Sequence, residues 1–277
     1  MGRVMDGNDC ICAYIQSTGI RVCHNGGFMR RLIILIGLAY CSLSIGQEQV
    51  GTMTGNDGKV YQTVKIGSQW WMAENLRETK YRDGSDIIVF NSEDFIAQAA
   101  IEMLVKLGSE PPGMLYINER FGGEINASAY GYLYNWYAAA DSLIIAPRGW
   151  RVPSDEDWKR LEMHLGMSRE ETNLYGGPWD RSGRVNSVAG KLKATAHWKS
   201  PNTGATDECG FGALPAGDCG PAADNFYGFG ATATFWSATS YNADAAWVRT
   251  LSYQYSQIYR SRASKRNGYS LRLIREN

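Results

Sequence analysis

The chain has 277 residues, of which 44% are hydrophobic and 20% are charged, a composition that suits a folded protein and excludes a disordered one. Its 28 basic and 28 acidic residues give a formal net charge of +0, which argues against nucleic-acid binding, because such proteins carry a basic excess. Nine Trp and 16 Tyr outnumber eight Phe, so most aromatic rings carry a polar group that suits recognition surfaces.

The first 46 residues predict export. Arg30 and Arg31 precede the apolar run 32–40, and small residues follow up to Gly46, which is the pattern of a signal peptide. We therefore expect a signal peptide at 29–46 that starts at Met29. Residues 1–28 would then be a mis-assigned start or a disordered extension.

The same segment bears on anchoring. The apolar run is too short to span a bilayer, so we expect no transmembrane helix in the mature chain. A lipid anchor at Cys41 remains an alternative, because the residues before this cysteine resemble a lipobox. The prediction is a protein that is secreted, or lies at the outer surface or in the periplasm.

Only two cysteines, Cys209 and Cys219, belong to the mature chain. In an oxidising compartment they could form a disulfide that closes a short glycine-rich loop. Two buried thiols are the alternative, and the sequence leaves both open.

The mature chain begins with β-structure. Asn56-Asp57-Gly58 is a turn signal, and the stretch 59–66 is rich in β-branched and aromatic residues. Gly67-Ser68 then predicts a two-residue hairpin turn into a strand at 69–72.

Three segments predict helices. In 92–107 apolar residues recur on one helical face, which we expect to be buried. The segment 154–165 starts with a capping-box pattern, Ser154 and Asp157, and carries an apolar stripe that includes Trp158. The third segment, 127–141, is dense in Tyr and Ala.

The remainder, from residue 175 onward, is rich in glycine and predicts short strands between long loops. We expect these strands at 211–214, 234–236, 246–248 and 270–274. No linker divides the mature chain, so 47–277 is expected to be a single domain.

Several blocks together resemble a known family, the major paralogous domain of Fibrobacter succinogenes, which is common in the Bacteroidetes. They include GKVYQTVKIGSQWWMAENL at 58–76, PRGWRVPSDEDWKRLE at 147–162, TDECGFGALPAG at 206–217 and GYSLRLI at 268–274. The blocks follow the family's order and cover almost the whole mature chain.

This family is similar in turn to formylglycine-generating enzymes, whose fold is related to C-type lectins. The resemblance implies an α+β fold, irregular and C-type lectin-like or formylglycine-generating-enzyme-like, with short twisted strands, a few helices and long loops. The stretch 87–124 is longer and more helical than the family suggests, so we interpret it as a helical insertion.

The resemblance does not carry over an activity. Formylglycine-generating enzymes use a C-terminal cysteine pair that binds copper, and the stretch 247–274 contains no cysteine. We therefore expect no enzyme activity, no catalytic residue, no metal site and no cofactor. Calcium remains a minor alternative, because Asp207, Glu208 and Asp218 could act as oxygen ligands.

The C-terminal segment 249–275 is the strongest indication of function. It has seven basic residues, no acidic ones and several interleaved tyrosines, and Tyr and Arg dominate binding hot spots. The predicted ligand-binding residues are Tyr241, Trp247, Tyr253, Tyr255, Tyr259, Arg260 and Arg262.

This pattern predicts a non-catalytic binding module for an extracellular glycan, peptide or protein. The segment also allows a second interpretation, in which its arginines balance the acidic insertion and half of its tyrosines are core residues. For the whole protein, the sequence leaves open a divergent formylglycine-generating-type enzyme, a structural envelope protein and a binding protein diversified by a retroelement.

Overall fold

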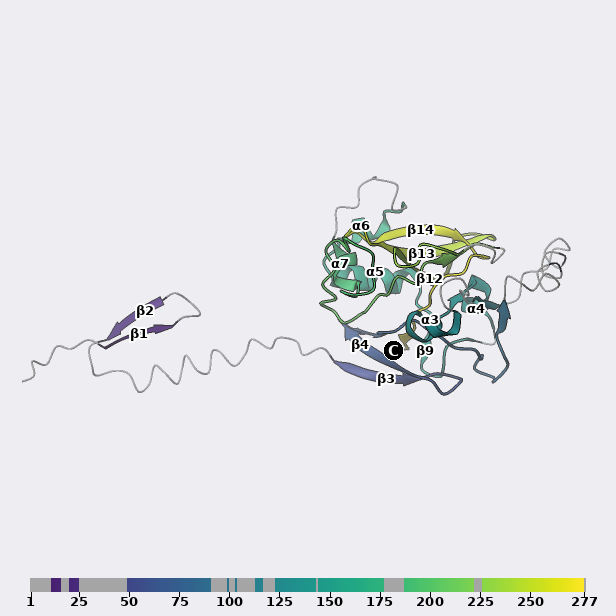
Figure 1. Cartoon of the computed structure of the whole chain (residues 1–277), viewed down its shortest axis with the longest axis horizontal. Helices are drawn as coiled ribbons and strands as arrows, with labels where there is room; N and C mark the ends of the chain where they lie inside the picture. Colours follow the sequence, from purple (N-terminus) through teal and green to yellow (C-terminus); the bar gives the residue numbers. More distant parts are fainter. Residues whose placement is uncertain are drawn as a thin grey trace, which may run out of the picture. The chain divides into compact units, whose positions relative to one another are not determined.

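The computed structural model describes a short N-terminal hairpin and most of the chain after residue 48. The described residues are 11–15, 20–24, 49–90, 99, 103, 113–116, 123–142, 144–176, 187–221 and 226–276. The chain divides into two units, Met1–Gln47 and Glu48–Asn277. In the first unit, β1 (Ile11–Ile15) and β2 (Ile20–His24) pair in antiparallel fashion (Figure 1). The expected signal peptide at 29–46 lies outside the described residues.

The second unit begins with three antiparallel strands, and both predicted turns are confirmed. Gly58 and Gly67 adopt positive φ angles, +83° and +60°, which glycine tolerates without strain. The strands are β3 (Val50–Thr54), β4 (Val60–Ile66) and β5 (Gln69–Met72).

The end of the chain completes this sheet. β15 (Ile274–Arg275) lies between β5 and β9 (Trp150–Arg151), so that the sheet has the order β3-β4-β5-β15-β9. The expected strand 270–274 is therefore shorter than predicted, although Ser270 also bridges to Phe235. The sheet cannot be completed before the last residues of the chain are in place.

A second small sheet joins β6 (Ile88–Phe90), β7 (Met114–Tyr116) and β8 (Leu133–Tyr134). Two of these strands belong to the expected helical insertion at 87–124. The predicted helix 92–107 lies outside the described residues except for Ala99 and Met103, which are helical and exposed. At these two positions the expected burial of the helix face is wrong.

The predicted single helix at 127–141 is also wrong. It is two helices, α3 (Gly123–Tyr130) and α4 (Trp136–Ala140), separated by β8. The break occurs at Gly131, which has a φ of +76° and lies so close to Asn75 that a Cβ atom would come within 2.6 Å of its side chain. Only glycine fits this position, and a continuous helix cannot pass through it.

The predicted helix after Pro153 is confirmed as α5 (Asp155–His164), with a complete capping box between Ser154 and Asp157. Trp158 on its inner face is fully buried. Two shorter helices follow, α6 (Arg169–Asn173) and α7 (Val188–Leu192). Among the helices that the structure describes, none combines the length and the apolar content needed to cross a lipid bilayer.

The C-terminal half is more regular than expected. Its strands form an antiparallel sheet of β12 (Thr232–Ser240), β13 (Ala245–Ser252) and β14 (Tyr259–Ser264), beside a small hairpin of β10 (Asp218–Cys219) and β11 (Phe226–Tyr227). The predicted strands at 234–236 and 246–248 are parts of β12 and β13. The segment 211–214 is not a strand and makes only a single bridge, at Ala213.

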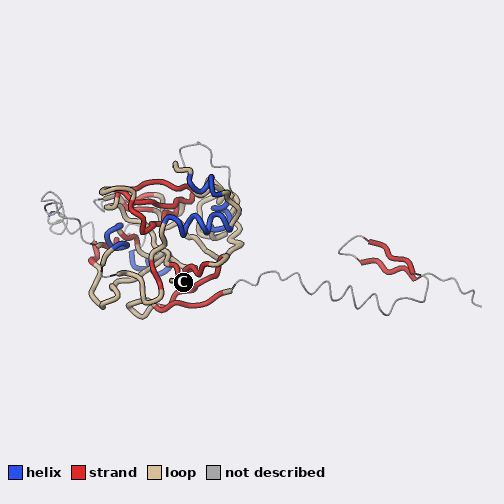
Figure 2. The backbone as a smooth tube through the Cα atoms, turned by 180° about the vertical axis from the view of Figure 1, so that it is seen from behind, coloured by secondary structure: helices blue, strands red, loops and turns tan. Residues whose placement is uncertain are grey.

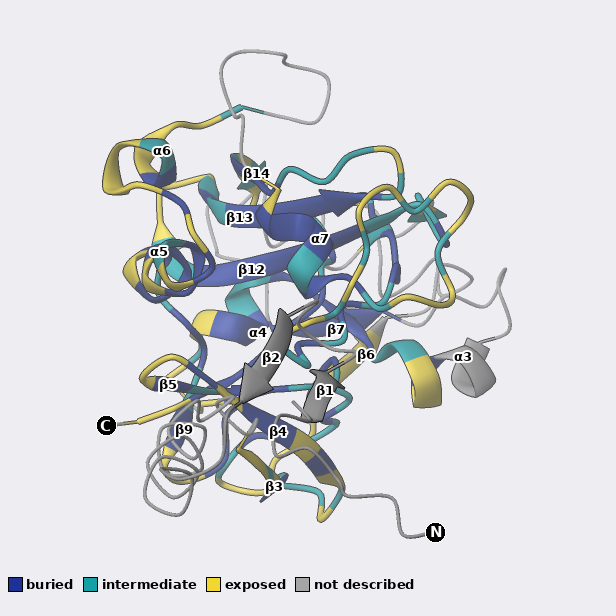
Figure 3. Ribbon diagram, turned by 90° about the vertical axis from the view of Figure 1, so that its left-hand side faces the viewer, coloured by how far each residue is buried: buried dark blue, intermediate teal, exposed yellow. Residues whose placement is uncertain are grey.

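Helices cover both faces of this sheet. Phe235 packs in one hydrophobic cluster with Trp158 of α5, and the next residue, Trp236, packs in another cluster with Ala138 of α4. α5, α6 and α7 lie beside the sheet, with long loops between the elements (Figures 2 and 3). The architecture is thus a mixed α+β fold with more strands than helices, as predicted at this level.

Candidate functional site

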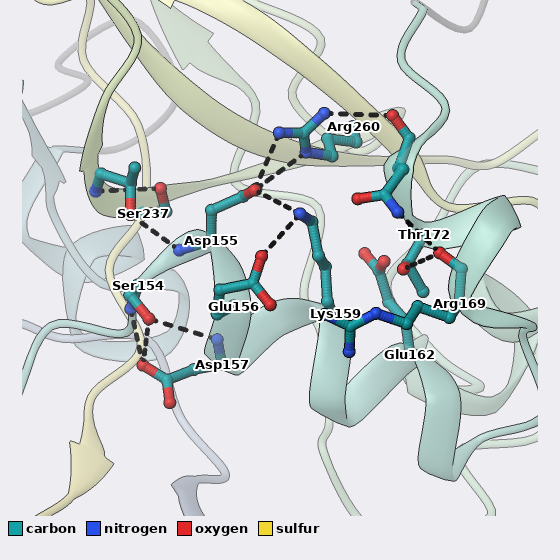
Figure 4. Close-up of polar contacts among 12 residues, drawn as sticks. Ser154, Asp155, Glu156, Asp157, Lys159, Glu162, Arg169, Thr172, Ser237 and Arg260 are labelled. Atoms are coloured by element: carbon teal, nitrogen blue, oxygen red, sulfur yellow. Dashed lines mark hydrogen bonds and ion pairs between the residues drawn. The ribbon is translucent and has the colours of Figure 1, made fainter.

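The site is built on the first turn of α5. The capping box directs Asp157 back to the backbone of Ser154, and the carboxylate of the neighbouring Asp155 reaches the strands. It accepts hydrogen bonds from Arg249 at 2.8 Å and from two nitrogens of Arg260 at 2.8 and 2.9 Å. Lys159 lies 3.3 Å from the same carboxylate (Figure 4).

A second carboxylate, Glu162 further along α5, pairs with Arg249, and both side chains are fully buried. Burial by itself would raise the pKa of Asp155, but the hydrogen bonds and charges of Arg260 and Arg249 outweigh it and lower this pKa to about 2. We call Asp155, Lys159, Glu162, Arg249 and Arg260 the buried charge cluster. Its ion pairs connect α5 to β13 and β14.

Next to this cluster lies the half-buried Trp247, with three exposed side chains around it. The guanidinium of Arg260 stacks on the ring of Trp247 at 3.3 Å from its centroid. Two tyrosine rings make T-shaped contacts with the Trp247 ring, Tyr241 at 5.2 Å and Tyr175 at 6.1 Å between centroids. Arg262, the cross-strand neighbour of Trp247, lies over both tyrosine rings. We call Tyr175, Tyr241, Trp247 and Arg262 the aromatic–arginine patch.

Hydrogen bonds hold the patch in place. The turn after Tyr241 is fixed by Asn242, whose side chain accepts from the backbone N–H groups of residues 244 and 245. On the other side, the N–H of Gly176 donates to the carbonyl of Arg260 and positions Tyr175. The tyrosines are 57% (Tyr175) and 44% (Tyr241) exposed, so rigid rings face solvent.

The structure separates the seven predicted binding residues into two groups. Tyr241, Trp247, Arg260 and Arg262 lie together at one end of β13, although Arg260 is buried beneath the ring of Trp247. The remaining three predicted residues, Tyr253, Tyr255 and Tyr259, lie at the other end of this strand.

One member of that second group, Tyr255, contacts a buried lysine through its backbone carbonyl. Lys193 donates to the carbonyls of Thr203, Ser252 and Tyr255 at 2.9 to 3.0 Å. Burial lowers its pKa to about 8. Tyr259 is buried. This end of the sheet is a structural junction, with less exposed aromatic surface than the patch.

The basic character of the C-terminal segment is largely internal. Arg249, Arg260, Lys265 and Arg272 are all buried, and Arg272 donates to the side chain of Asn75 and to three backbone carbonyls. Only three of the seven basic residues are exposed, namely Arg262, Arg266 and Arg275. The second interpretation of this segment, in which many of its residues are structural, therefore holds for more than half of the basic ones.

The model of the Fibrobacter succinogenes major domain family matches residues 64–275. The chain belongs to this family. No curated protein and no solved structure is similar enough to the chain to match it. The buried charge cluster and the aromatic–arginine patch of this chain both lie within the matched range.

This Fibrobacter succinogenes major domain also has an open hollow of about 400 Å³ on another side. Its lining residues are Lys59, Val60, Arg77, Ala127, Ser128 and Tyr132. Both of its cations are already paired, Lys59 with Asp57 and Arg77 with Glu74 at 3.4 Å. It offers an incoming anion less uncompensated charge than the patch does.

The two cysteines of the domain are thiols in the structure, and no disulfide joins them. Cys209 packs against the cluster of Trp158, and Cys219 belongs to a third cluster with Met114. Each Sγ donates to a nearby carbonyl, that of Lys191 or that of Gly220.

The expected oxygen ligands for calcium are partly engaged elsewhere. Asp207 accepts from the N–H of Gly212, and Glu208 pairs with Lys191 at 3.0 Å. Across the described ranges, no group of three or more His, Cys, Asp and Glu side chains is arranged to hold a metal ion.

Sequence reasoning missed five residues of this site, namely Tyr175 of the patch and Asp155, Lys159, Glu162 and Arg249 of the buried charge cluster. Tyr175 follows α6 by two positions in sequence and lies far from the C-terminal segment, so only its position before Gly176-Gly177 marked it as an exposed loop aromatic. Asp155 was recognisable as an acidic residue in the first turn of a helix, but the partners that it binds are 94 and 105 positions away.

Proposed function

We propose that this family member is an exported, non-catalytic binding module that recognises an extracellular glycan, peptide or protein through the aromatic–arginine patch. The observation that carries the proposal is the exposure of Tyr175 and Tyr241 in contact with Arg262, next to strands that buried ion pairs connect to α5. Rigid, exposed aromatic and arginine side chains are the residue types that concentrate binding energy.

Two further elements of the proposal come from the sequence. The arginine pair and apolar run before residue 47 support export, whether as a free protein or one anchored at Cys41. The relation of the family to formylglycine-generating enzymes supports a C-type lectin-like fold, and the lack of cysteine in 247–274 supports a binding role over catalysis.

Arrays of glycans and peptides test the proposal. The double variant Tyr175→Ala/Tyr241→Ala removes both exposed rings of the patch, and we expect it to lose every array signal by tenfold or more. Tyr227→Ala is the matched control, because Tyr227 is equally exposed, at 54%, but lies on β11, outside the patch.

Both variants are expected to melt within a few degrees of the wild type, because they truncate exposed side chains. Array signals that survive unchanged in the folded double variant would exclude the patch as the binding surface. Absence of any signal for the wild-type protein would contradict the proposed function itself.

A further inference from the structure

Three arginines stand next to each other on the face of β13 and β14 that α5 covers, and their partners differ. Arg249 pairs with Glu162 and Asp155, and Arg260 pairs with Asp155. Arg262 is exposed, and among the described residues no carboxylate forms an ion pair with it. Of these three arginines, Arg262 is therefore the one whose charge is available to bind a partner outside the described residues.

The surroundings of Arg262 fix its guanidinium without neutralising it. Nη1 donates to the hydroxyl of Tyr241 at 2.8 Å, and the guanidinium carbon lies 4.7 Å from the Tyr241 ring centroid and 5.2 Å from that of Tyr175. A guanidinium has five N–H donors, and the Tyr241 hydroxyl takes one of them. A planar fork held in this way is pre-organised to bind a carboxylate through two parallel hydrogen bonds.

We infer that the patch binds a sugar that carries a carboxylate, a uronic acid residue of an acidic glycan, with the carboxylate on Arg262 and the sugar ring against Tyr241 or Tyr175. This inference rests on the proposed function. Tyrosine rings offer flat apolar faces with a polar edge, which match the C–H faces and hydroxyls of a pyranose.

The distribution of positive charge around the patch favours a ligand whose negative charges are spaced apart. Arg249, Arg260, Lys265 and Arg272 are buried, so within the described part of the C-terminal segment these four cations add nothing to a basic surface around Arg262 of the kind that polyphosphates and nucleic acids require. One carboxylate per sugar residue matches one exposed guanidinium.

The backbone near the patch favours a glycan over an acidic peptide. Extended peptides commonly bind by adding a strand to an open sheet edge. At the outer edge of β14 the carbonyl of Arg260 already accepts from the N–H of Gly176. A peptide strand could therefore pair with this part of the edge only after displacing Gly176.

Isothermal titration of the full chain with tetragalacturonate, and with the same tetrasaccharide after reduction of its carboxyl groups, tests the inference. We expect tetragalacturonate to bind at least tenfold more tightly than the reduced sugar. Arg262→Gln should remove that difference, and Arg262→Lys should retain part of it. Tyr241→Phe, which loses the hydroxyl and keeps the ring, should weaken binding less than Tyr241→Ala.

The control is Arg266→Gln, which removes an exposed arginine outside the patch and should leave the affinity for tetragalacturonate unchanged. Equal affinity for the charged and reduced sugars, or no binding of tetragalacturonate at millimolar concentration, would overturn the inference. So would equally tight, Arg262-dependent binding of a tetraglutamate peptide. In each of these cases the proposed function stands if the Tyr175→Ala/Tyr241→Ala variant still loses its array signals, and it falls if that variant does not.

Discussion

At the scale of single residues, Asp155 connects the interior of the protein to its binding surface. Its carboxylate holds Arg260, Arg260 stacks under Trp247, and the two exposed tyrosines contact Trp247. Because each contact positions the next side chain, the geometry of the patch depends on a buried charge. A partner removed from such a buried pair leaves the other charge without compensation.

Replacing Asp155 with Asn is expected to destabilise the protein by about 3 kcal/mol, because Arg249 and Arg260 remain buried with one carboxylate fewer. Urea denaturation at pH 7 measures the change. Glu156→Gln is the control, since the Glu156 side chain is 54% exposed and its ion pair within the described residues is with Lys159, and it should cost less than about 0.5 kcal/mol. A similar loss of unfolding free energy in the two variants would contradict the role of Asp155 in neutralising the buried arginines.

The same variant changes the response to acid. The pKa of Asp155 is about 2 in the folded protein and lies below its ordinary value of 3.8, so its contribution to stability is complete above pH 3.8 and disappears as the pH falls toward 2. The free energy of unfolding of the wild-type protein should therefore fall more steeply between about pH 4 and pH 2 than that of Asp155→Asn. Parallel pH profiles would argue against the ion pairs with Arg249 and Arg260.

At the scale of elements, the segment between α3 and β8 shows how one glycine decides where a helix ends. Alanine-rich and tyrosine-rich sequence on both sides of Gly131 would allow a helix to continue. The chain turns instead, because it passes directly over residues 75 and 76. The turn places Tyr134 in β8 and lets Asn135 cap α4.

Gly131→Ala tests this close approach. The added Cβ would lie 2.6 Å from the Cβ of Asn75 and 2.7 Å from the carbonyl oxygen of Leu76, in addition to an unfavourable φ. We expect a loss of more than about 2 kcal/mol in urea denaturation. Gly58→Ala is the matched control, because its φ is similar, +83°, but nothing lies within 4 Å, so it should cost about 1 kcal/mol. An equal loss of unfolding free energy in the two variants would show that the close approach of Gly131 to residues 75 and 76 plays no part.

At the scale of the whole molecule, the C-terminal residues pack in the interior of the second unit and pair with its strands. β15 completes the sheet between β5 and β9, and Leu273 and Ile274 are buried in two different hydrophobic clusters. Arg272 donates to acceptors on Met72, Asn75, Phe211 and Gly212. The last few residues therefore connect segments that lie up to 200 positions apart.

A chain of residues 48–271 is accordingly expected not to fold, whereas one of residues 48–277 should fold cooperatively, because it contains a complete compact unit. Near-ultraviolet circular dichroism, which reports packed aromatic rings, distinguishes the two outcomes. A cooperative thermal transition in the shorter chain would show that β15 and Arg272 are dispensable.

The sequence by itself determined the local features whose causes lie within a few residues. The turns at 56–58 and 67–68, the capping box of α5 and its buried stripe follow from turn chemistry, hydrogen-bond capping and helical periodicity, and the family follows from blocks of sequence. Only the tertiary structure decided which arginines lie inside and which face solvent, since Arg249, Arg260 and Arg262 are the same residue type on neighbouring strands. Their difference arises from the distant carboxylates of α5, which neutralise the first two, whereas Arg262 contacts two exposed tyrosine rings.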